Sequence, residues 1–171
     1  MSQTKNKAWK IMLLHLVSLF CFFLLFGIDQ LSKAWAVSHL KDQLPRTFFH
    51  DWFELFYLEN KGAAWGMLSG QTTFLIIITV VVLVAIFLWY AKIPYQKQTI
   101  VLKLSLIMIA SGALGNMMDR ILHHYVIDFL YVKRIDFPVF NIADIYVTLG
   151  AVLFVLAYLF QKEPEKSEEQ S

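Results

Sequence analysis

Residues Ser111 to Asp144 read SGALGNMMDRILHHYVIDFLYVKRIDFPVFNIAD, and this stretch decides the fold. It sets six polar or charged side chains among apolar residues, namely Asn116, Asp119, Arg120, Asp128, Asn141 and Asp144. Ionisable groups are costly to bury near hydrocarbon, so they mark candidate functional sites in a membrane protein. Asp128 lies in an apolar run and Asp144 opens the last hydrophobic segment, so we predict that they form an acid/base pair. The alternative is that all six cap helix ends or pair with nearby lysines and arginines.

The composition is that of an integral membrane protein. Of 171 residues, 58% are hydrophobic and 16% are charged, and the mean hydropathy is +0.56, whereas about a quarter of the residues in a soluble domain are charged. The formal net charge of +2 is too small to indicate a nucleic acid as partner. The single cysteine, Cys21, excludes an intramolecular disulfide and a multi-cysteine metal site, and we expect neither a metal nor another cofactor.

Four apolar runs are long enough to cross a bilayer. We predict helices over about residues 11–29, 73–91, 100–118 and 142–160, in one membrane-embedded domain of residues 1–160. The first run is longer than a signal-peptide core and lacks a cleavage site, which favours an uncleaved helix. Residues 161–171 are charged and predict a disordered cytoplasmic tail.

The connections between the runs carry their own signals. Residues 31–70 are too polar to span the membrane and too aromatic for a plain loop, so we expect them to lie on the membrane surface. Residues 48–58 and 125–132 each suit short strands. The turn at residues 60–66, NKGAAWG, is made of small residues that allow another backbone to approach, and Gly112 and Gly115 suit close helix packing.

The distribution of charge predicts the topology. Eight of the 15 basic residues lie in the N-terminal segment, the connection at residues 92–103 and the C-terminal tail. The positive-inside rule makes this side cytoplasmic, and four helices put both termini there. Six polar residues from separate places then meet at the outer interface: Asp29, Asn60, Asn116, Asp128, Asn141 and Asp144. This convergence on one membrane face indicates a site.

Five motifs, in order along the chain, resemble those of the lipoprotein signal peptidases. This family, also called signal peptidase II or peptidase family A8, consists of bacterial intramembrane aspartic proteases. The motifs are DQLSK at 29–33, NKGAAWG at 60–66, GALGNMMDR at 112–120, VIDF at 126–129 and FPVFNIAD at 137–144. The departures are small: Ser111, Ile127 and Trp65 stand where the family usually has Gly, Val and Phe.

The resemblance implies a fold and a site. The fold would be an all-α membrane protein with four transmembrane helices, a small extracytoplasmic β-cradle and an interfacial helix. Asp128 and Asp144 would be the catalytic dyad, sharing one proton because two close carboxylates cannot both ionise cheaply. The residues expected to bind substrate are Asn60, Asn116, Arg120 and Asn141. Those expected to support the site are Asp29, Lys33, Gly62 and Asp119.

The resemblance also implies an activity and its partners. The expected protein is an aspartic endopeptidase of the bacterial cytoplasmic membrane, acting at the outer face. It would cleave prolipoproteins just before a lipobox cysteine that carries diacylglyceryl. We expect a monomer in contact with membrane lipid, inhibited by globomycin as the family is. The alternatives are a proton or ion transporter that uses the acids as a relay, or a membrane scaffold, and both are disfavoured because the acids cluster at one interface.

Overall fold

The computed structural model describes residues 2–49, 52–63 and 66–160. The predicted tail at 161–171 and the Trp65 position therefore lie outside the described residues. The elements, in order, are α1 (Ser2–Leu40), β1 (Arg46–Phe48), β2 (Phe53–Asn60), α2 (Thr72–Lys92), η2 (Lys97–Thr99), α3 (Ile100–His123), β3 (Val126–Val132), η3 (Lys133–Ile135) and α4 (Ile142–Leu159). The predicted class, four long apolar helices with a small sheet, is confirmed.

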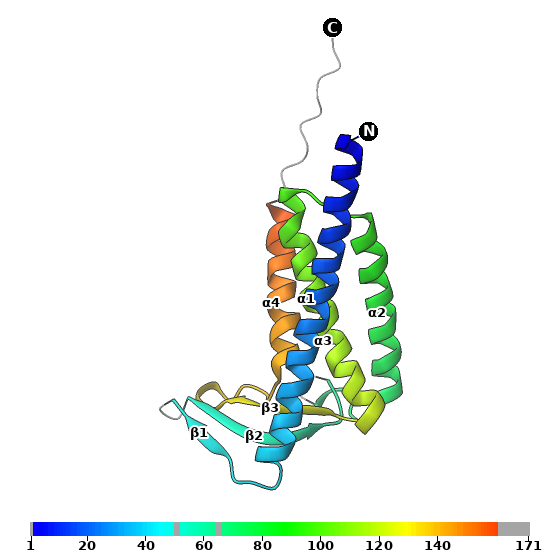
Figure 1. Ribbon diagram of the computed structural model, residues 1–171. Coiled ribbons are helices and arrows are strands. Elements are labelled where there is room, and N and C mark those ends of the chain that lie inside the picture. Colours follow the sequence, from blue (N-terminus) through cyan, green and yellow to red (C-terminus); the bar gives the residue numbers. More distant parts are fainter. Residues whose placement is uncertain (1, 50–51, 64–65, 161–171) are drawn as a thin grey trace.

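The four helices form a bundle with α3 at its centre (Figure 1). All four are long and apolar enough to cross a membrane. Helix α3 packs against α1, α2 and α4 and contains most of the buried helical residues, while α2 has none. Most side chains of α2 are exposed, as expected for a helix whose solvent is lipid, while Ile86 and Tyr90 pack against a buried cluster that includes Leu102 and Leu106 of α3.

Glycines allow α3 to approach its neighbours closely. A Cβ atom at Gly112 would overlap the carbonyl oxygen of Ala143, on α4. A Cβ atom at Gly115 would overlap the carboxylate of Asp29, on α1. The predicted role of these two glycines in close packing is confirmed, because no larger residue fits without moving a neighbouring helix.

Helix α1 differs most from its predicted span of 11–29, since it is one helix of 39 residues. At 1.5 Å per residue it is about 58 Å long, well beyond the roughly 30 Å of a hydrocarbon core. The prediction ended the helix at Asp29 because the sequence there becomes polar. In the structure Lys33 pairs with both Asp29 and Asp119, so these charges are tolerated in the helix interior.

The last turns of α1 contain residues 31–40, the first part of the segment 31–70 that is expected to lie on the membrane surface. Residues 31–40 are helical and pack beneath the sheet, where Ala36 and Leu40 are buried against Ile127 and Phe129. Helix α3 also runs further than predicted, to His123, and ends where His124 adopts a left-handed conformation with φ of 65°. Helices α2 and α4 begin and end within one residue of their predicted positions.

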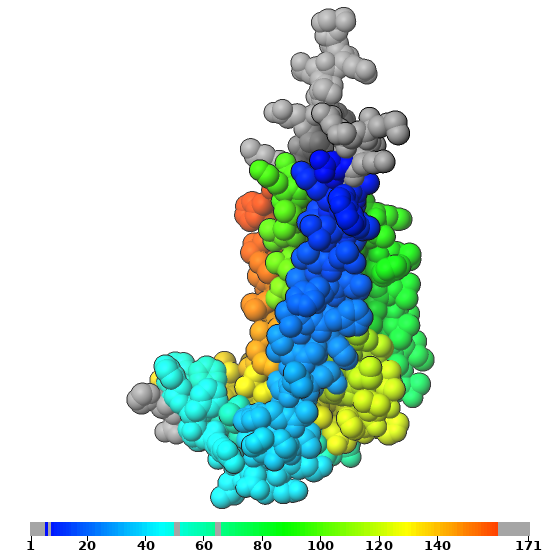
Figure 2. Space-filling model, in the orientation of Figure 1, coloured from blue at the N-terminus to red at the C-terminus, as the bar shows by residue number. Residues whose placement is uncertain are grey.

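The sheet covers the end of the bundle where α1 and α3 finish and α4 begins, opposite the N-terminus (Figure 1). Its order is β1-β2-β3, with antiparallel neighbours. Leu58 lies opposite Asp128, and Asn60 lies opposite Val126. This register places Asn60 diagonally from Asp128 on the same face. The space-filling view shows the strands projecting sideways from the helical body (Figure 2).

Candidate active site

Asp128 lies in β3, and its side chain is almost completely buried, with 1% exposure. Two amide groups donate to it: Nδ2 of Asn60 at 2.8 Å to Oδ2, and Nδ2 of Asn141 at 2.7 Å to Oδ1. Asn60 reaches it from the neighbouring strand, and Asn141 reaches it from the residue that caps α4. The carboxyl is therefore fixed from two elements at once.

Asp144 lies in the first turn of α4, where Asn141 is the N-cap. The two residues form a reciprocal capping box: the backbone N–H of Asp144 donates to Oδ1 of Asn141, and the N–H of Asn141 donates to Oδ2 of Asp144, both at 3.0 Å. Nδ2 of Asn116, on α3, donates to the other carboxylate oxygen at 2.8 Å. Asn141 thus donates to both aspartates, which places them in one site.

The orientation of the three asparagine amides follows from their other contacts. Each side-chain oxygen accepts from a group that can only donate: Gly62 N–H for Asn60 (3.0 Å), the Lys33 ammonium for Asn116 (2.9 Å) and Asp144 N–H for Asn141 (3.0 Å). The NH2 group of each amide must then face a carboxyl oxygen, and a flipped amide would set two acceptors against each other.

A buried ion-pair triad lies behind the aspartates. Nζ of Lys33 is 3.0 Å from Oδ2 of Asp29 and 3.0 Å from Oδ2 of Asp119, and the three side chains are at most 3% exposed. The ammonium group of Lys33 donates a third hydrogen bond to Oδ1 of Asn116. An ammonium has three donors, so Lys33 is fully satisfied by these three acceptors.

The triad also holds the backbone beside each aspartate of the pair. Oδ1 of Asp29 accepts from the N–H of Ala143 at 3.0 Å, and Oδ2 of Asp119 accepts from the N–H of Ile127 at 3.1 Å. Ala143 immediately precedes Asp144, and Ile127 immediately precedes Asp128. Lys33 therefore joins Asp29 and Asp119, the two carboxylates that hold the backbone next to Asp144 and Asp128.

Arg120 bridges α3 and the turn that follows β2. Its guanidinium donates to the carbonyl oxygen of Asn116 at 3.2 Å and to that of Gly62 at 2.9 Å. A Cβ atom at Gly62 would meet the backbone of Gly66 and Met67, so this turn is closely packed on itself. Arg120 thereby fixes the turn whose N–H orients Asn60.

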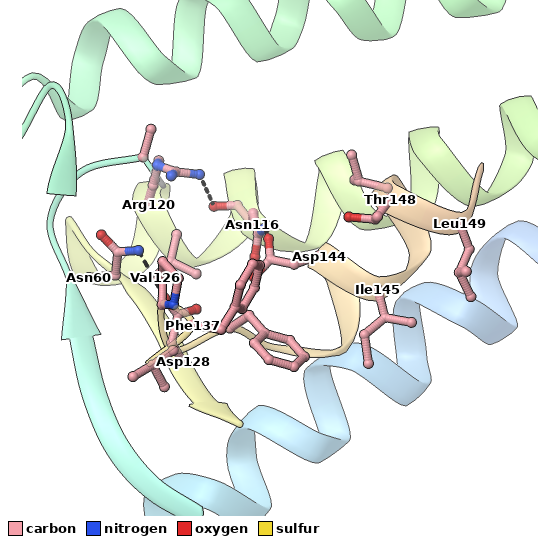
Figure 3. Close-up of a pocket in the computed structure, with 15 residues that line it drawn as sticks. Asn60, Asn116, Arg120, Val126, Asp128, Phe137, Asp144, Ile145, Thr148 and Leu149 are labelled. Atoms are coloured by element: carbon pink, nitrogen blue, oxygen red, sulfur yellow. Dashed lines mark hydrogen bonds between the residues drawn. The ribbon is translucent and has the colours of Figure 1, made fainter. Parts of the chain in front are cut away.

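A cavity of about 510 Å³ opens onto these groups (Figure 3). Its polar lining residues are Asn60, Asn116, Arg120, Asp128, Asp144 and Thr148. The rest of the lining is apolar and comes from the turn after β2, from β3, from α4 and from residues 137–140. The polar groups gather at one end, and Ile145, Thr148 and Leu149 follow α4 away from them (Figure 3).

The environment of Asp128 changes its proton affinity. Burial raises the pKa of this carboxyl, and the nearby Asp144 raises it further, to about 7. The hydrogen bonds from Asn60 and Asn141 act in the opposite direction but do not outweigh burial. A carboxyl that holds a proton near neutral pH, beside a second carboxyl and a cavity, can act as a general acid. Within residues 2–49, 52–63 and 66–160, no three His, Cys, Asp or Glu side chains gather as metal ligands would.

All ten residues predicted for the site belong to one connected hydrogen-bond network, although their roles remain predictions. Asn141, expected to bind substrate, is completely buried and is not among the residues that line the cavity. Gln30 also belongs to this network, although it is not among the predicted site residues. Its amide donates to Asp29 at 3.1 Å, to Asp119 at 3.2 Å and to the carbonyl of Gly115. Its position inside the DQLSK motif was the available signal.

Comparisons with known proteins agree with this architecture. The family model described as signal peptidase (SPase) II matches residues 21–160. A lipoprotein signal peptidase of Clostridium acetobutylicum is 37% identical over 142 residues, covering 81% of this chain and 90% of the relative. One from Streptococcus pyogenes is 40% identical over 133 residues, covering 78% of this chain and 86% of the relative. A solved structure described as a bacterial membrane enzyme has a TM-score of 0.76 at 29% identity, covering 91% of this chain and 94% of the other.

Proposed function

Since this chain belongs to the signal peptidase II family, we propose that Asp128 and Asp144 are the catalytic dyad of its protease activity. The protein is a bacterial membrane protease that cleaves the signal peptides of lipoproteins, as its sequence motifs predicted. The alternative of an ion transporter is not supported. One observation carries the assignment of the dyad: a single residue, Asn141, donates to both carboxyl groups, at the end of a cavity.

The two aspartates divide the proton chemistry. We assign the shared proton to Asp128, because burial and Asp144 raise its pKa to about 7. Asp144 is then the charged member, at the N-terminus of α4, where the helix dipole favours negative charge. It accepts a proton from water as the water oxygen attacks the scissile carbonyl carbon. Asp128 donates its proton to the carbonyl oxygen, which gives a neutral tetrahedral diol.

Collapse of the diol completes the reaction. The bond from carbon to the cysteine nitrogen breaks, a proton moves from Asp144 to that nitrogen, and a hydroxyl proton returns to Asp128. The products are a carboxyl group at the end of the signal peptide and a free amine on the cysteine, and the dyad regains its starting state. Atoms and protons balance without a covalent enzyme intermediate.

The surrounding residues position rather than react. Amides do not titrate and arginine stays protonated, so neither exchanges protons in the cycle. Asn60, Asn116 and Asn141 align the two carboxyl groups, and those that line the cavity also contact substrate. Arg120 holds the turn at Gly62, and a lysine would replace its two diverging N–H groups by a single point donor. Arg120→Lys should therefore lower kcat. An unchanged rate would show that Arg120 contributes only its positive charge.

The substrate is a prolipoprotein whose lipobox cysteine carries diacylglyceryl. Apolar cavity walls, formed by Val139, Phe140 and Leu149 among others, suit a lipidated and largely apolar ligand. Globomycin binds the same cavity and competes with the substrate. The protein acts as a monomer, and its acyl-bearing substrate stays in contact with membrane lipid.

The site faces the outside of the cell, and both termini are cytoplasmic. The support is the excess of lysine at the ends of the helices remote from the sheet, together with the position of the dyad at the sheet end of the bundle (Figure 1). A dyad at the outer interface would meet both the membrane-bound signal peptide and water.

Purified protein in detergent tests the function directly. A diacylated lipobox peptide should give a product with a free amino group on the lipidated cysteine, identified by mass spectrometry. Globomycin should suppress the product. Cleavage at another bond, or ion flux through liposomes without peptide cleavage, would contradict the proposal.

A further inference from the structure

Thr148 is the one polar side chain in the cavity lining that takes no part in the network around the dyad. The other polar lining residues are Asn60, Asn116, Arg120, Asp128 and Asp144, and each is bonded within that network. The neighbours of Thr148 in the wall, Val147 and Leu149, are apolar. The Thr148 side chain is exposed, and an exposed hydroxyl on a membrane-spanning helix is costly unless it gains a hydrogen-bond partner.

The position of Thr148 relative to Asp144 follows from the helix. It comes four residues later on α4, so the two side chains lie on the same face of the helix, about 6 Å apart along its axis. Figure 3 shows Thr148 beside Leu149 on the part of α4 that leads away from the polar end of the cavity. A ligand that reaches from the dyad along α4 would pass this hydroxyl.

Hydroxyl groups inside apolar helices usually bond to the carbonyl four residues earlier. Thr79 does so with Leu75 at 2.8 Å, and Ser111 does so with Ile107 at 2.7 Å. For Thr148 that carbonyl belongs to Asp144, and its exposed hydroxyl makes no hydrogen bond among the residues the structure describes. The donor is therefore available to a ligand in the cavity.

We propose that the Thr148 hydroxyl binds substrate by donating a hydrogen bond to a carbonyl oxygen, one helical turn inward from Asp144. This inference rests on the proposed function of the dyad. An extended peptide advances about 3.3 Å per residue, so 6 Å corresponds to about two residues of signal peptide before the scissile bond. The ester carbonyls of the diacylglyceryl group lie at a comparable distance from the scissile bond. Both offer the same acceptor, a carbonyl oxygen flanked by apolar groups.

Thr148→Val removes the hydroxyl and keeps the shape. Loss of one neutral hydrogen bond should lower kcat/KM for a diacylated lipobox peptide roughly 2- to 10-fold. The change should appear chiefly in KM, because the contact is remote from the reacting atoms. Thr148→Ser restores the donor and should recover most of the loss. Thr79→Val is the matched control, since Thr79 lies on α2 away from the cavity and should leave KM unchanged.

A second substrate identifies the acceptor. In a dialkyl peptide, ether links replace the two esters and no ester carbonyl remains. A Thr148→Val penalty that persists on this substrate assigns the bond to a peptide carbonyl, and a penalty that disappears assigns it to an ester. Either result supports the inference.

Several results would overturn it. Wild-type KM and kcat in a monodisperse Thr148→Val protein would show that the hydroxyl makes no contact with substrate. Equal losses in the Val and Ser variants would indicate shape rather than hydrogen bonding. If Thr148→Val is not monodisperse, Thr148→Ala takes its place, with the same expected loss in KM. Because wild-type protein that fails to cleave the peptide would overturn the proposed function as well, the two failures are distinguishable.

Discussion

Oδ1 of Asp29 accepts a 3.0 Å hydrogen bond from the backbone N–H of Ala143, the residue immediately before Asp144. Asp29 is completely buried and is paired with Lys33. A carboxylate on α1 therefore sets the position of a member of the proposed dyad on α4. Asp119 does the same for Asp128 through Ile127, and Lys33 joins the two anchors.

Replacement of Lys33, whose ammonium group joins Asp29 and Asp119, should destabilise the whole site. Lys33→Met leaves two buried carboxylates facing each other, and breaking a buried pair in this way costs about 3–5 kcal/mol. Lys41→Met is the control, because the Lys41 pair with Glu59 is exposed by 42% and 35% and such exposed pairs contribute little to stability. Denaturation in detergent measures both. Equal effects would show that the buried triad has no special role.

Gly115→Ala should disrupt the same region by overlap. The added methyl group would collide with the carboxylate of Asp29, so both stability and cleavage should fall. Gly27→Ala is the matched control, since a Cβ atom there meets nothing within 4 Å, and a helical Gly→Ala change commonly gains about 0.5–1 kcal/mol. A Gly115→Ala protein as stable and active as wild type would contradict the close packing of α1 on α3.

The pKa of Asp128 predicts the pH dependence of cleavage. This carboxyl is protonated below a pH of about 7 and charged above it, whereas an unperturbed aspartate loses its proton near 3.8. The reaction needs that proton, so kcat/KM should fall as the pH rises through about 7, approaching tenfold per pH unit. For folding, the raised pKa contributes stability that is present below pH 3.8 and lost as the pH rises through about 7. A pH profile of kcat/KM that stays flat well above pH 7 would contradict the assignment of the proton.

The sequence predicts the ends of α2 and α4 better than the ends of α1 and α3. Helices α2 and α4 are bounded by clear changes in polarity, so their ends were found within one residue. Helix α1 extends beyond its predicted end at Asp29 because Lys33, which pairs with Asp29, also pairs with Asp119, 86 residues later in the chain. Local polarity cannot reveal such a partner.

For the site, too, local sequence reveals some features and not those that depend on partners distant in the chain. The motifs identified the residue types that meet near the dyad, because carboxyl and amide groups stand out in an apolar chain. The role of each of these residues depends on which hydrogen-bond partners its side-chain atoms contact in the folded protein. Asn141, expected to bind substrate, is buried outside the cavity lining; the DQLSK motif contains Gln30 but does not show its contacts with Asp29 and Asp119, and nothing in the local sequence marks Thr148.

Cysteine labelling tests the topology, in a background where Cys21 is replaced by serine. A cysteine at Ser69, in the turn before α2, should react with an impermeant reagent in intact cells. A cysteine at Gln98, in η2 at the other end of the bundle, should react only after permeabilisation. The reverse pattern would place the dyad on the cytoplasmic side.

The central claim is that Asp128 and Asp144 act together as one catalytic unit. Asp128→Asn and Asp144→Asn keep the shape of each side chain but remove proton exchange, so each should lose about 10²–10⁴-fold or more in rate. The double variant should be scarcely slower than either single variant, because the two groups work as one. Asp119→Asn is the control, and its loss of activity should follow its loss of folded protein.

Single-turnover cleavage of a diacylated lipobox peptide, normalised to protein that runs as a monodisperse peak in detergent, tests this most directly. We predict that both dyad variants are folded and inactive. Near-native turnover in either variant, together with a folded but inactive Asp119→Asn protein, would contradict the assignment and make Asp119 a member of the pair.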